Sequence, residues 1–361
     1  MGQISFARGI PAPELLPVEE LADCAKAALE RDGRRILNYG PAGGYEPLRA
    51  WIGERHGVDP ARVVVTNGSL QGLAFLAGRL VQGGRVVVEL PTYDRPLKLL
   101  AELGAEVVGI PVDDEGLDVD ALEAELRNGG QASFLYTIPT FQNPSGRTLS
   151  TERRRRLVEL AREHELLIIE DDPYGLIRYE GTAGPTLFEL GGADVVYSSS
   201  FSKTIAPGAR VGYLVLPERL VGPVTGAATA TYITPSLVSE ATVYEFLRRG
   251  LFEPNLARVR AGLRERRDAM LAALERDLVG AARWSRPDGG YFLWLELGDE
   301  LDAVELLRRA EQEGVTYVPG VDFGGPASSL RLAFSFVDAA AISDGIARLA
   351  ALVPASASAS I

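Results

Sequence analysis

Short apolar runs alternate with amphipathic helical patterns over residues 63–216, and this alternation predicts a mainly parallel β-sheet with helices on its faces. Seven of the runs have the length and the β-branched content of buried strands. They lie at residues 62–66, 85–90, 106–112, 133–137, 166–171, 194–200 and 211–216. We therefore expect a large α/β domain built on a seven-stranded sheet.

The pattern changes after Pro254. Residues 253–278 read as one long charged amphipathic helix, followed by apolar runs at 289–297 and 329–335 with a helical pattern at about 302–313 between them. These elements predict a smaller α+β unit, and a chain of 361 residues is long for a single core. We expect a large domain at residues 40–250 and a small domain made of residues 1–39 and 251–361.

Charge and composition narrow the possible partners. The formal net charge is −12, which disfavours nucleic acid because phosphate binding needs a positive surface. The exception is the arginine run in "TERRRRLVEL" (151–160), which we interpret as a solvated helix face where Glu152 pairs with Arg155 and Arg156.

No apolar run approaches the roughly 18 residues of a membrane helix, and the first residues lack the apolar core of a signal peptide. We expect a cytoplasmic protein with no membrane partner. The chain has one cysteine, Cys24, and two histidines, so we expect neither an internal disulfide nor a metal site.

Lysine is scarce, which draws attention to Lys203. Only three of the 37 basic residues are lysines. Arginine cannot replace lysine as a nucleophilic amine, because its guanidinium stays protonated. Lys203 follows the predicted strand 194–200, so it could form a Schiff base with an aldehyde and then act as a general base. Ser200, Ser202 and Arg210 beside it could bind a phosphate, and a plain surface lysine is the alternative.

Three more polar clusters follow predicted strands, at the edge where open parallel sheets bind ligands. In "VTNGSLQGL" the backbone N–H groups of Ser69 and Leu70 could hold a phosphate at a helix start, although Ser69 as an ordinary N-cap explains the pattern equally well.

The second cluster, "LIIEDDPYGL", ends a buried strand with carboxylates. A buried Asp171 could keep a pyridine nitrogen protonated, with a solvated strand end as the alternative. In the third cluster, "TIPTFQNPSGRT", Asn143 is either part of a plain turn or an amide donor to the phenolic oxygen of the same ring, together with Tyr174.

These segments resemble the fold type I pyridoxal 5'-phosphate (PLP) enzymes, specifically the class I/II aminotransferases of the 2-aminoadipate and kynurenine type. Ten segments match in order: "ISFARGIPAPELLP", "LNYGPAGGYEPLRAWI", "GSLQGL", "VVELPTYDRPL", "PTFQNPSGRTLS", "IIEDDPYG", "SSSFSKTIAPGARVGYL", "PDGGYFLWLEL", "YVPGVDFG" and "LRLAFS". The resemblance implies an α/β fold type I PLP transferase.

The resemblance also implies the roles of individual residues. Lys203 is the expected Schiff-base lysine, Asp171 the partner of the pyridine nitrogen, and Tyr174 a donor to the phenolic oxygen. Asn143 is the second donor and also lies at the substrate. The remaining implied contacts are Tyr93 stacked on the ring, Ser69, Leu70, Ser200, Ser202 and Arg210 at the phosphate, Arg331 at the substrate α-carboxylate, and Tyr39 at the phosphate of a neighbouring subunit, which implies a homodimer.

The sequence departs from the family pattern at three places. Leu70 stands where relatives often have glutamine, and the chain is shorter between about 216 and 255. Arg8 replaces a glycine in the N-terminal segment that covers the substrate in this family, so we predict that Arg8 pairs with an acidic substrate side chain.

The function implied by the resemblance is transfer of an amino group from an α-amino acid to a 2-oxo acid by a ping-pong mechanism. Other PLP reactions, such as β-elimination, decarboxylation or oxidation, would use the same residues and stay open. A non-catalytic sensor domain is a further alternative, although such regulators have a DNA-binding domain ahead of it, and only about 40 residues precede the first core motif. The motifs do not identify the donor or the acceptor.

Overall fold

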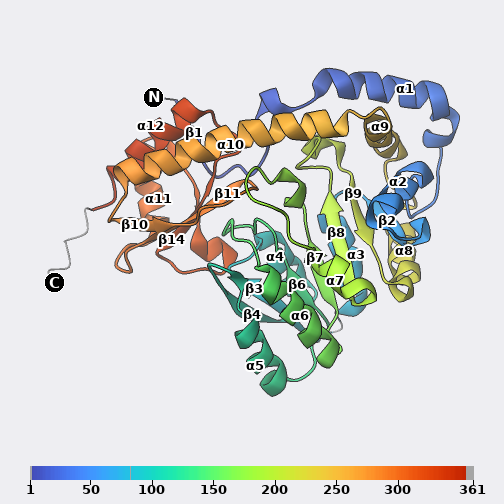
Figure 1. Ribbon diagram of the computed structural model, residues 1–361, viewed down its shortest axis with the longest axis horizontal. Helices are drawn as coiled ribbons and strands as arrows, with labels where there is room; N and C mark the ends of the chain where they lie inside the picture. Colours follow the sequence, from blue (N-terminus) through green and yellow to red (C-terminus); the bar gives the residue numbers. More distant parts are fainter. Residues whose placement is uncertain (1, 82, 355–361) are drawn as a thin grey trace.

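The computed structural model describes residues 2–81 and 83–354, and its centre is one large mixed sheet (Figure 1). Within the described residues the strand order is β2-β9-β8-β7-β6-β3-β4-β5. The bounds are β2 (Val63–Thr66), β9 (Gly212–Val215), β8 (Val195–Ser200), β7 (Ile168–Asp171), β6 (Leu135–Thr137), β3 (Arg85–Leu90), β4 (Glu106–Asp113) and β5 (Gly116–Leu117). The seven predicted strands are all present, and the short β5 is added at the edge.

The five strands from β8 to β4 run parallel, whereas β9 is antiparallel to both of its neighbours. Residues of β7 and β8 are buried throughout, including the acidic Glu170 and Asp171 at the end of β7. The carboxyl ends of these parallel strands meet at one edge, and the polar clusters of the sequence follow them there.

Helices cover both faces of this sheet. Figure 1 shows α6 and α7 in front of the sheet and α3 behind it, and α3 packs against β8 and β9. The helices that accompany the large sheet are α2 (Glu46–His56), α3 (Ser69–Leu80), α4 (Asp94–Glu102), α5 (Val119–Gly129), α6 (Thr151–Glu163), α7 (Leu187–Gly191), α8 (Glu218–Tyr232) and α9 (Leu237–Arg248).

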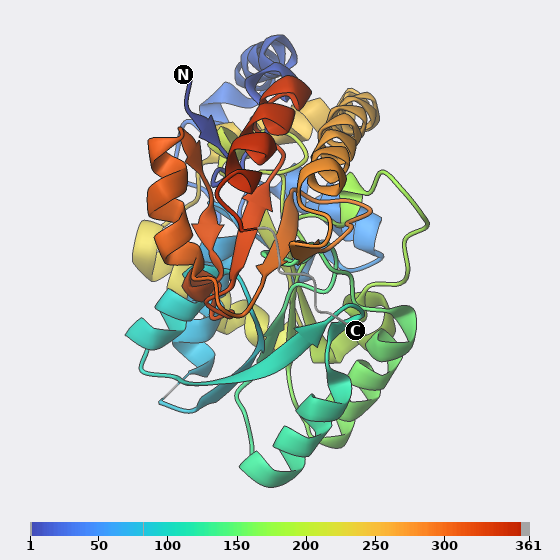
Figure 2. The same ribbon diagram turned by 90° about the vertical axis from the view of Figure 1, so that its left-hand side faces the viewer.

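A second, antiparallel sheet has the order β10-β11-β14-β13 and is coloured orange to red in Figure 2. Its strands are β10 (Ala282–Trp284), β11 (Phe292–Leu297), β13 (Val318–Pro319) and β14 (Ser329–Ala333), and its helices are α11 (Ala303–Gln312) and α12 (Ala339–Ala350). The N-terminal strand joins this part of the molecule, because β1 (Ile4–Ser5) pairs with β12 (Val315–Thr316). The predicted domain limits at residues 40 and 250 stay a prediction.

Two long helices connect these parts. Figure 1 shows α10 (Phe252–Asp277) extending from the region of α12 to α9, and α1 (Val18–Ile36) packs against α9. Cys24 is buried in α1. Among the described residues, no helix is long and apolar enough to cross a membrane.

The prediction for the arginine run was wrong in part. Arg154 is buried and donates to the carbonyl oxygens of Leu149 and Pro139 at 2.9 and 2.7 Å. Arg156 pairs with Glu123 of α5 at 2.9 Å, and none of the ion pairs among the described residues includes Glu152. The run therefore ties α6 to neighbouring loops and helices, which a pattern confined to one helix cannot reveal.

Candidate active site

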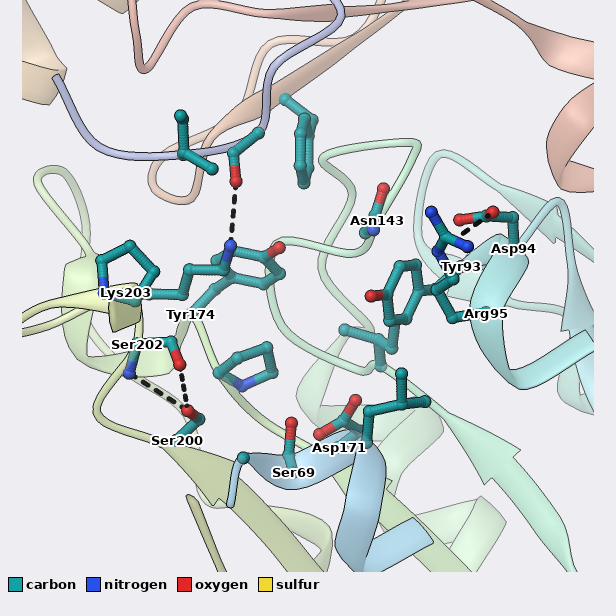
Figure 3. A pocket seen from close by; sticks show the side chains of 18 of the residues that line it. Ser69, Tyr93, Asp94, Arg95, Asn143, Asp171, Tyr174, Ser200, Ser202 and Lys203 are labelled. Atoms are coloured by element: carbon teal, nitrogen blue, oxygen red, sulfur yellow. Dashed lines mark hydrogen bonds and ion pairs between the residues drawn. The ribbon is translucent and has the colours of Figure 1, made fainter. Parts of the chain in front are cut away.

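A cavity of about 470 Å³ opens at the carboxyl ends of β7 and β8 (Figure 3). Most of the predicted site residues line it: Ser69, Leu70, Tyr93, Asn143, Asp171, Tyr174, Ser200, Ser202, Lys203, Arg210 and Arg331. Arg331 comes from β14 of the small sheet and the others from the large-sheet half of the chain. The fold thus brings together side chains that are up to 262 positions apart in the sequence, from Ser69 to Arg331.

One end of the cavity is a cluster of hydrogen-bond donors. Helix α3 begins after Gly68, which has a φ of 95° and is the N-cap, and no side chain caps the helix. Ser69 is therefore the first helical residue and not the N-cap, so its hydroxyl is not used for capping. Arg210 Nη2 donates to the Asn67 carbonyl at 2.9 Å, and a Cβ at Gly68 would lie 2.3 Å from that nitrogen. Glycine is favoured here because other residues rarely adopt a φ of 95°.

The hydroxyls of Ser200 and Ser202 complete this end, joined by a 2.7 Å hydrogen bond. A helix start, three serine hydroxyls and a guanidinium all offer donors to one place, which is the chemistry that binds a phosphate group.

Lys203 lies in the middle of the cavity. Its Nζ donates to the carbonyl oxygen of Gly9 at 2.9 Å and lies 5.2 Å from the ring centroid of Tyr291. Burial, together with the charges of Arg331 and Arg210, lowers the pKa of Lys203 to about 8, while the charge of Asp171 opposes this shift. A much larger fraction of this amine is neutral at pH 7 to 8 than of an exposed lysine, so it is suited to nucleophilic and base chemistry.

Asp171 ends β7 and points into the same cavity (Figure 3). Burial raises its pKa to about 6, against hydrogen bonds from Tyr136 and Ser198 that lower it. Nothing in the sequence around Tyr136 marks it as a functional residue. Its place in an apolar strand looks like ordinary core packing, and its contact with Asp171 depends on the pairing of β6 with β7.

Tyr174 follows Asp171 by three residues and is buried, which raises the pKa of its hydroxyl well above the ordinary value. It therefore stays protonated and can donate a hydrogen bond. Asn143 is also buried, and its Oδ1 accepts from Arg331 Nη1 at 2.9 Å. The amide NH₂ of Asn143 remains as a donor.

Arg331 is held between two aromatic rings, 4.2 Å from the centroid of Phe292 and 4.7 Å from that of Phe323. Burial lowers its pKa to about 10. Its Nη2 donates to the Ala7 carbonyl at 2.9 Å, whereas its buried Nε has no hydrogen-bond partner among the described residues. A buried guanidinium with an unused donor favours a carboxylate as ligand.

Residues 6–10, which we call the strap, contribute Gly9 and Ile10 to the lining of this cavity. The strap is held by its carbonyl groups: Ala333 donates its N–H to Phe6, Arg331 donates to Ala7, and Ser335 donates its hydroxyl to Ile10. Arg8 itself is exposed and does not line the cavity, since its guanidinium stacks over Phe336 at 5.1 Å. Tyr39 also lies outside the lining and is 75% exposed.

Two charged lining residues were missed by the sequence analysis. Asp94 and Arg95 follow Tyr93 at the start of α4 and lie at the far side of the cavity from Lys203 (Figure 3). Arg95 Nε is 3.6 Å from Asp94 Oδ2, which also accepts from Lys98 at 2.9 Å. The sequence "TYDRP" could have indicated both residues, because they directly follow Tyr93, which was itself predicted to contact the cofactor.

The donor set fits pyridoxal 5'-phosphate. The Ser69, Ser200, Ser202 and Arg210 end matches its phosphate, the amine of Lys203 matches its aldehyde, and the carboxyl group of Asp171 matches its ring nitrogen. Among the described residues, no group of three histidine, cysteine or acidic side chains is placed to hold a metal ion.

Comparisons with known proteins agree with this chemistry. Residues 4–349 match the family "Aminotransferase class I and II". The chain is 41% identical to a 2-aminoadipate transaminase of Thermus thermophilus over 358 residues, covering 96% of this chain and 89% of that protein. It is also 30% identical to an uncharacterized HTH-type transcriptional regulator of Bacillus subtilis, covering 95% of this chain and 72% of that protein.

Among solved structures, the α-aminoadipate aminotransferase of Thermus thermophilus, complexed with N-(5'-phosphopyridoxyl)-L-leucine, superposes with a TM-score of 0.93. The identity is 38%, and the match covers 97% of this chain and 92% of that one. The chain belongs to the class I and II aminotransferases. It has the fold type I architecture, uses pyridoxal 5'-phosphate and catalyses transamination.

Proposed function

We propose that the cavity around Lys203 transfers the amino group of an α-amino acid to a 2-oxo acid with the residue roles set out below. The observation that supports this most strongly is the position of Lys203, a half-buried amine of lowered pKa between a cluster of phosphate donors and an arginine with an unused donor. Bound PLP supplies an aldehyde for the amino group and a ring that withdraws electrons from the substrate Cα.

Lys203 Nζ would hold the cofactor through its aldehyde, and the freed amine would move the proton of the substrate Cα. Asp171 holds a proton at the ring nitrogen, and Asn143 and Tyr174 donate to the phenolic oxygen. Tyr93 stacks on the ring. The phosphate is bound by Ser69, Leu70, Ser200, Ser202 and Arg210.

Arg331 binds the α-carboxylate of the substrate. Its guanidinium is already oriented by Phe292, Phe323 and Asn143, so little side-chain freedom is lost on binding. The strap shields this end of the cavity from water, which strengthens the charge–charge contact. Because the same arginine binds both the amino acid and the 2-oxo acid, one site serves both half-reactions.

The active unit in this proposal is a homodimer. Tyr39 is 75% exposed and lies away from the cavity of its own chain. Such a position suits a tyrosine that reaches the phosphate of the neighbouring subunit. A location in the cytoplasm stays a prediction from the sequence.

We propose 2-aminoadipate as one amino donor, supported by the name of the relative from Thermus thermophilus. Arg95 at the mouth of the cavity is placed to meet a second carboxylate, whereas Arg8 would have to leave Phe336 to do so. A half-reaction tests the proposal: the cofactor-loaded protein is mixed with one amino acid and no acceptor. We expect stoichiometric conversion of the cofactor to its amine form and release of the matching 2-oxo acid. Release of ammonia or carbon dioxide without that conversion would show another PLP reaction.

A second candidate function is that of a sensor, since the relative from Bacillus subtilis is a transcriptional regulator. Steady-state turnover separates the two. A protein that converts its cofactor once but never completes a cycle with any 2-oxo acid would favour the sensor.

A further inference from the structure

Asp171 receives a hydrogen bond from each of the two strands beside β7. Its Oδ2 accepts from the hydroxyl of Tyr136 on β6 at 2.8 Å, and its Oδ1 accepts from the hydroxyl of Ser198 on β8 at 3.1 Å. The sheet register explains this arrangement. Ser198 lies opposite Asp171, and Tyr136 lies opposite Ile169, which shares a face with Asp171 because side chains alternate along a strand.

Both donors are sealed in the protein interior. Tyr136 is 1% exposed and Ser198 is 2% exposed, and neither lines the cavity. Water therefore does not replace either hydrogen bond. Burial and the neighbouring charge of Asp171 raise the pKa of Tyr136 well above the ordinary value, so its hydroxyl remains a donor at any working pH.

We propose that Tyr136 and Ser198 are positioning residues that hold Asp171 as an oriented anion facing the pyridine nitrogen of the cofactor. This inference rests on the proposed function, which assigns that nitrogen to Asp171. Each carboxylate oxygen accepts one of these bonds and keeps a second lone pair for the ring N–H. Donors to a carboxylate favour its charged form, whereas burial alone favours the neutral acid.

Other titratable groups also face Asp171, so the test must hold them constant. The negative charge of Asp172 beside it on the chain raises its pKa and the positive charge of Lys203 lowers it. The charge of Asp171 in turn raises the pKa of four groups on other elements. They are Glu89 of β3, Tyr93 before α4, Tyr136 of β6 and Tyr174 after β7. Removing one hydroxyl leaves all of the charges in place.

The opposite face of the sheet offers a matched control. Tyr197 of β8 is also buried, and its hydroxyl donates to Asp172 Oδ2 at 2.9 Å. Tyr197→Phe therefore removes the same group from the neighbouring carboxylate, one residue along the chain, on the face that is turned away from Lys203.

The first measurement uses the cofactor-free protein with ¹³C-labelled aspartate carboxyls, where the signal of Asp171 is assigned by its absence in Asp171→Asn. We expect Tyr136→Phe to raise the titration midpoint of Asp171 by about one pH unit. Ser198→Ala should raise it by less, because its bond is longer, and Tyr197→Phe should leave it unchanged. The proposal is overturned if the titration midpoint of Asp171 is the same in the parent and in all three variants. If Tyr136→Phe does not fold, the midpoint in Ser198→Ala alone decides the test.

The second measurement uses pyridoxal 5'-phosphate labelled with ¹⁵N in the ring. We expect the ring signal of Tyr136→Phe to move toward the unprotonated value, with kcat at pH 7 about tenfold lower, and that of Tyr197→Phe to match the parent. Identical ring signals in the two variants would contradict the inference. If Asp171→Asn keeps full turnover, the proposed role of Asp171 itself is wrong. If Asp171→Asn loses turnover but Tyr136→Phe behaves like Tyr197→Phe, Asp171 keeps its role and only the positioning role of Tyr136 is wrong.

Discussion

Two cavities flank the end of strand β7, and they contain similar residues with different partners. Asp171 faces the cavity of Lys203, whereas Asp172 faces a second cavity of about 370 Å³ that is also lined by Arg154, His56 and Tyr197. We call these the lysine cavity and the histidine cavity. Both have a buried carboxylate, tyrosine hydroxyls and a buried arginine.

The two cavities differ in their nucleophile, because Lys203 lines the first and no lysine lines the second. In the histidine cavity Asp172 accepts from Tyr197 and from the backbone N–H of Gly175, and Arg154 has carbonyl acceptors for both Nε and Nη2. A buried arginine Nε without a partner among the described residues occurs in both cavities, at Arg331 in the lysine cavity and at Arg178 in the histidine cavity. Burial of charge alone therefore does not identify an active site. An unfilled hydrogen-bonding position beside a nucleophilic amine is the better criterion.

The largest contrast is expected at the amine. Lys203→Ala removes the group that moves the Cα proton, so kcat should fall at least about 10³-fold. Lys26→Ala, which loses an exposed lysine near Glu30, is the control and should keep normal rates. Steady-state kinetics with the best donor give both values. Turnover in Lys203→Ala close to that of the control would end the assignment of the lysine cavity as the active site.

The two buried arginines should respond differently to the same change. Lysine cannot reproduce the planar fork of arginine. Arg331→Lys should therefore lower kcat/KM about 100-fold, corresponding to the loss of about 3 kcal/mol of charge-assisted hydrogen bonding.

Arg154→Lys should leave catalysis nearly unchanged. Its guanidinium bridges Leu149 and Pro139, so we expect the free energy of unfolding to fall by about 3 kcal/mol while kcat/KM of the folded protein changes less than about threefold. Denaturant unfolding and kinetics on both variants test the pair. If the two variants change kcat/KM and the free energy of unfolding by the same amounts, the two cavities do not differ in function.

The histidine cavity should contribute to the pH dependence of stability through His56. Burial lowers the pKa of His56 from 6.5 to about 4, helped by the charge of Arg55. The folded state thus resists protonation, and stability that is complete above pH 6.5 is lost as the pH falls toward 4. Between pH 7 and 4.5 the parent should lose about 2 to 3 kcal/mol relative to His56→Gln. If the free energies of unfolding of the parent and of His56→Gln change by the same amount over this pH range, the lowered pKa of His56 is contradicted.

Much of the fold was predictable because β7 and β8 are buried on both faces and read as continuous runs. The catalytic cluster was predictable for a related reason: Lys203 and Asp171 directly follow such runs, at the edge where parallel strands end. The contacts of Tyr136 and Arg154 were not predictable, since they depend on which strands and loops are neighbours. The expected pairing of Glu152 with the arginine run was wrong for the same reason. A helical pattern reveals neighbours three and four residues away on the same helix, but it does not reveal contacts with other elements of the fold.

The smallest expected effect concerns the mouth of the lysine cavity and decides between two arginines. Arg95 lines the cavity and Arg8 stacks on Phe336. If Arg95 meets a distal carboxylate, Arg95→Ala should raise KM for 2-aminoadipate about tenfold or less, because the side chain is exposed and the contact is screened, while KM for leucine stays constant. Arg8→Ala should change neither donor by more than about twofold. The opposite result, with selective loss in Arg8→Ala, would mean that the strap rearranges when substrate binds and that the prediction from the sequence holds.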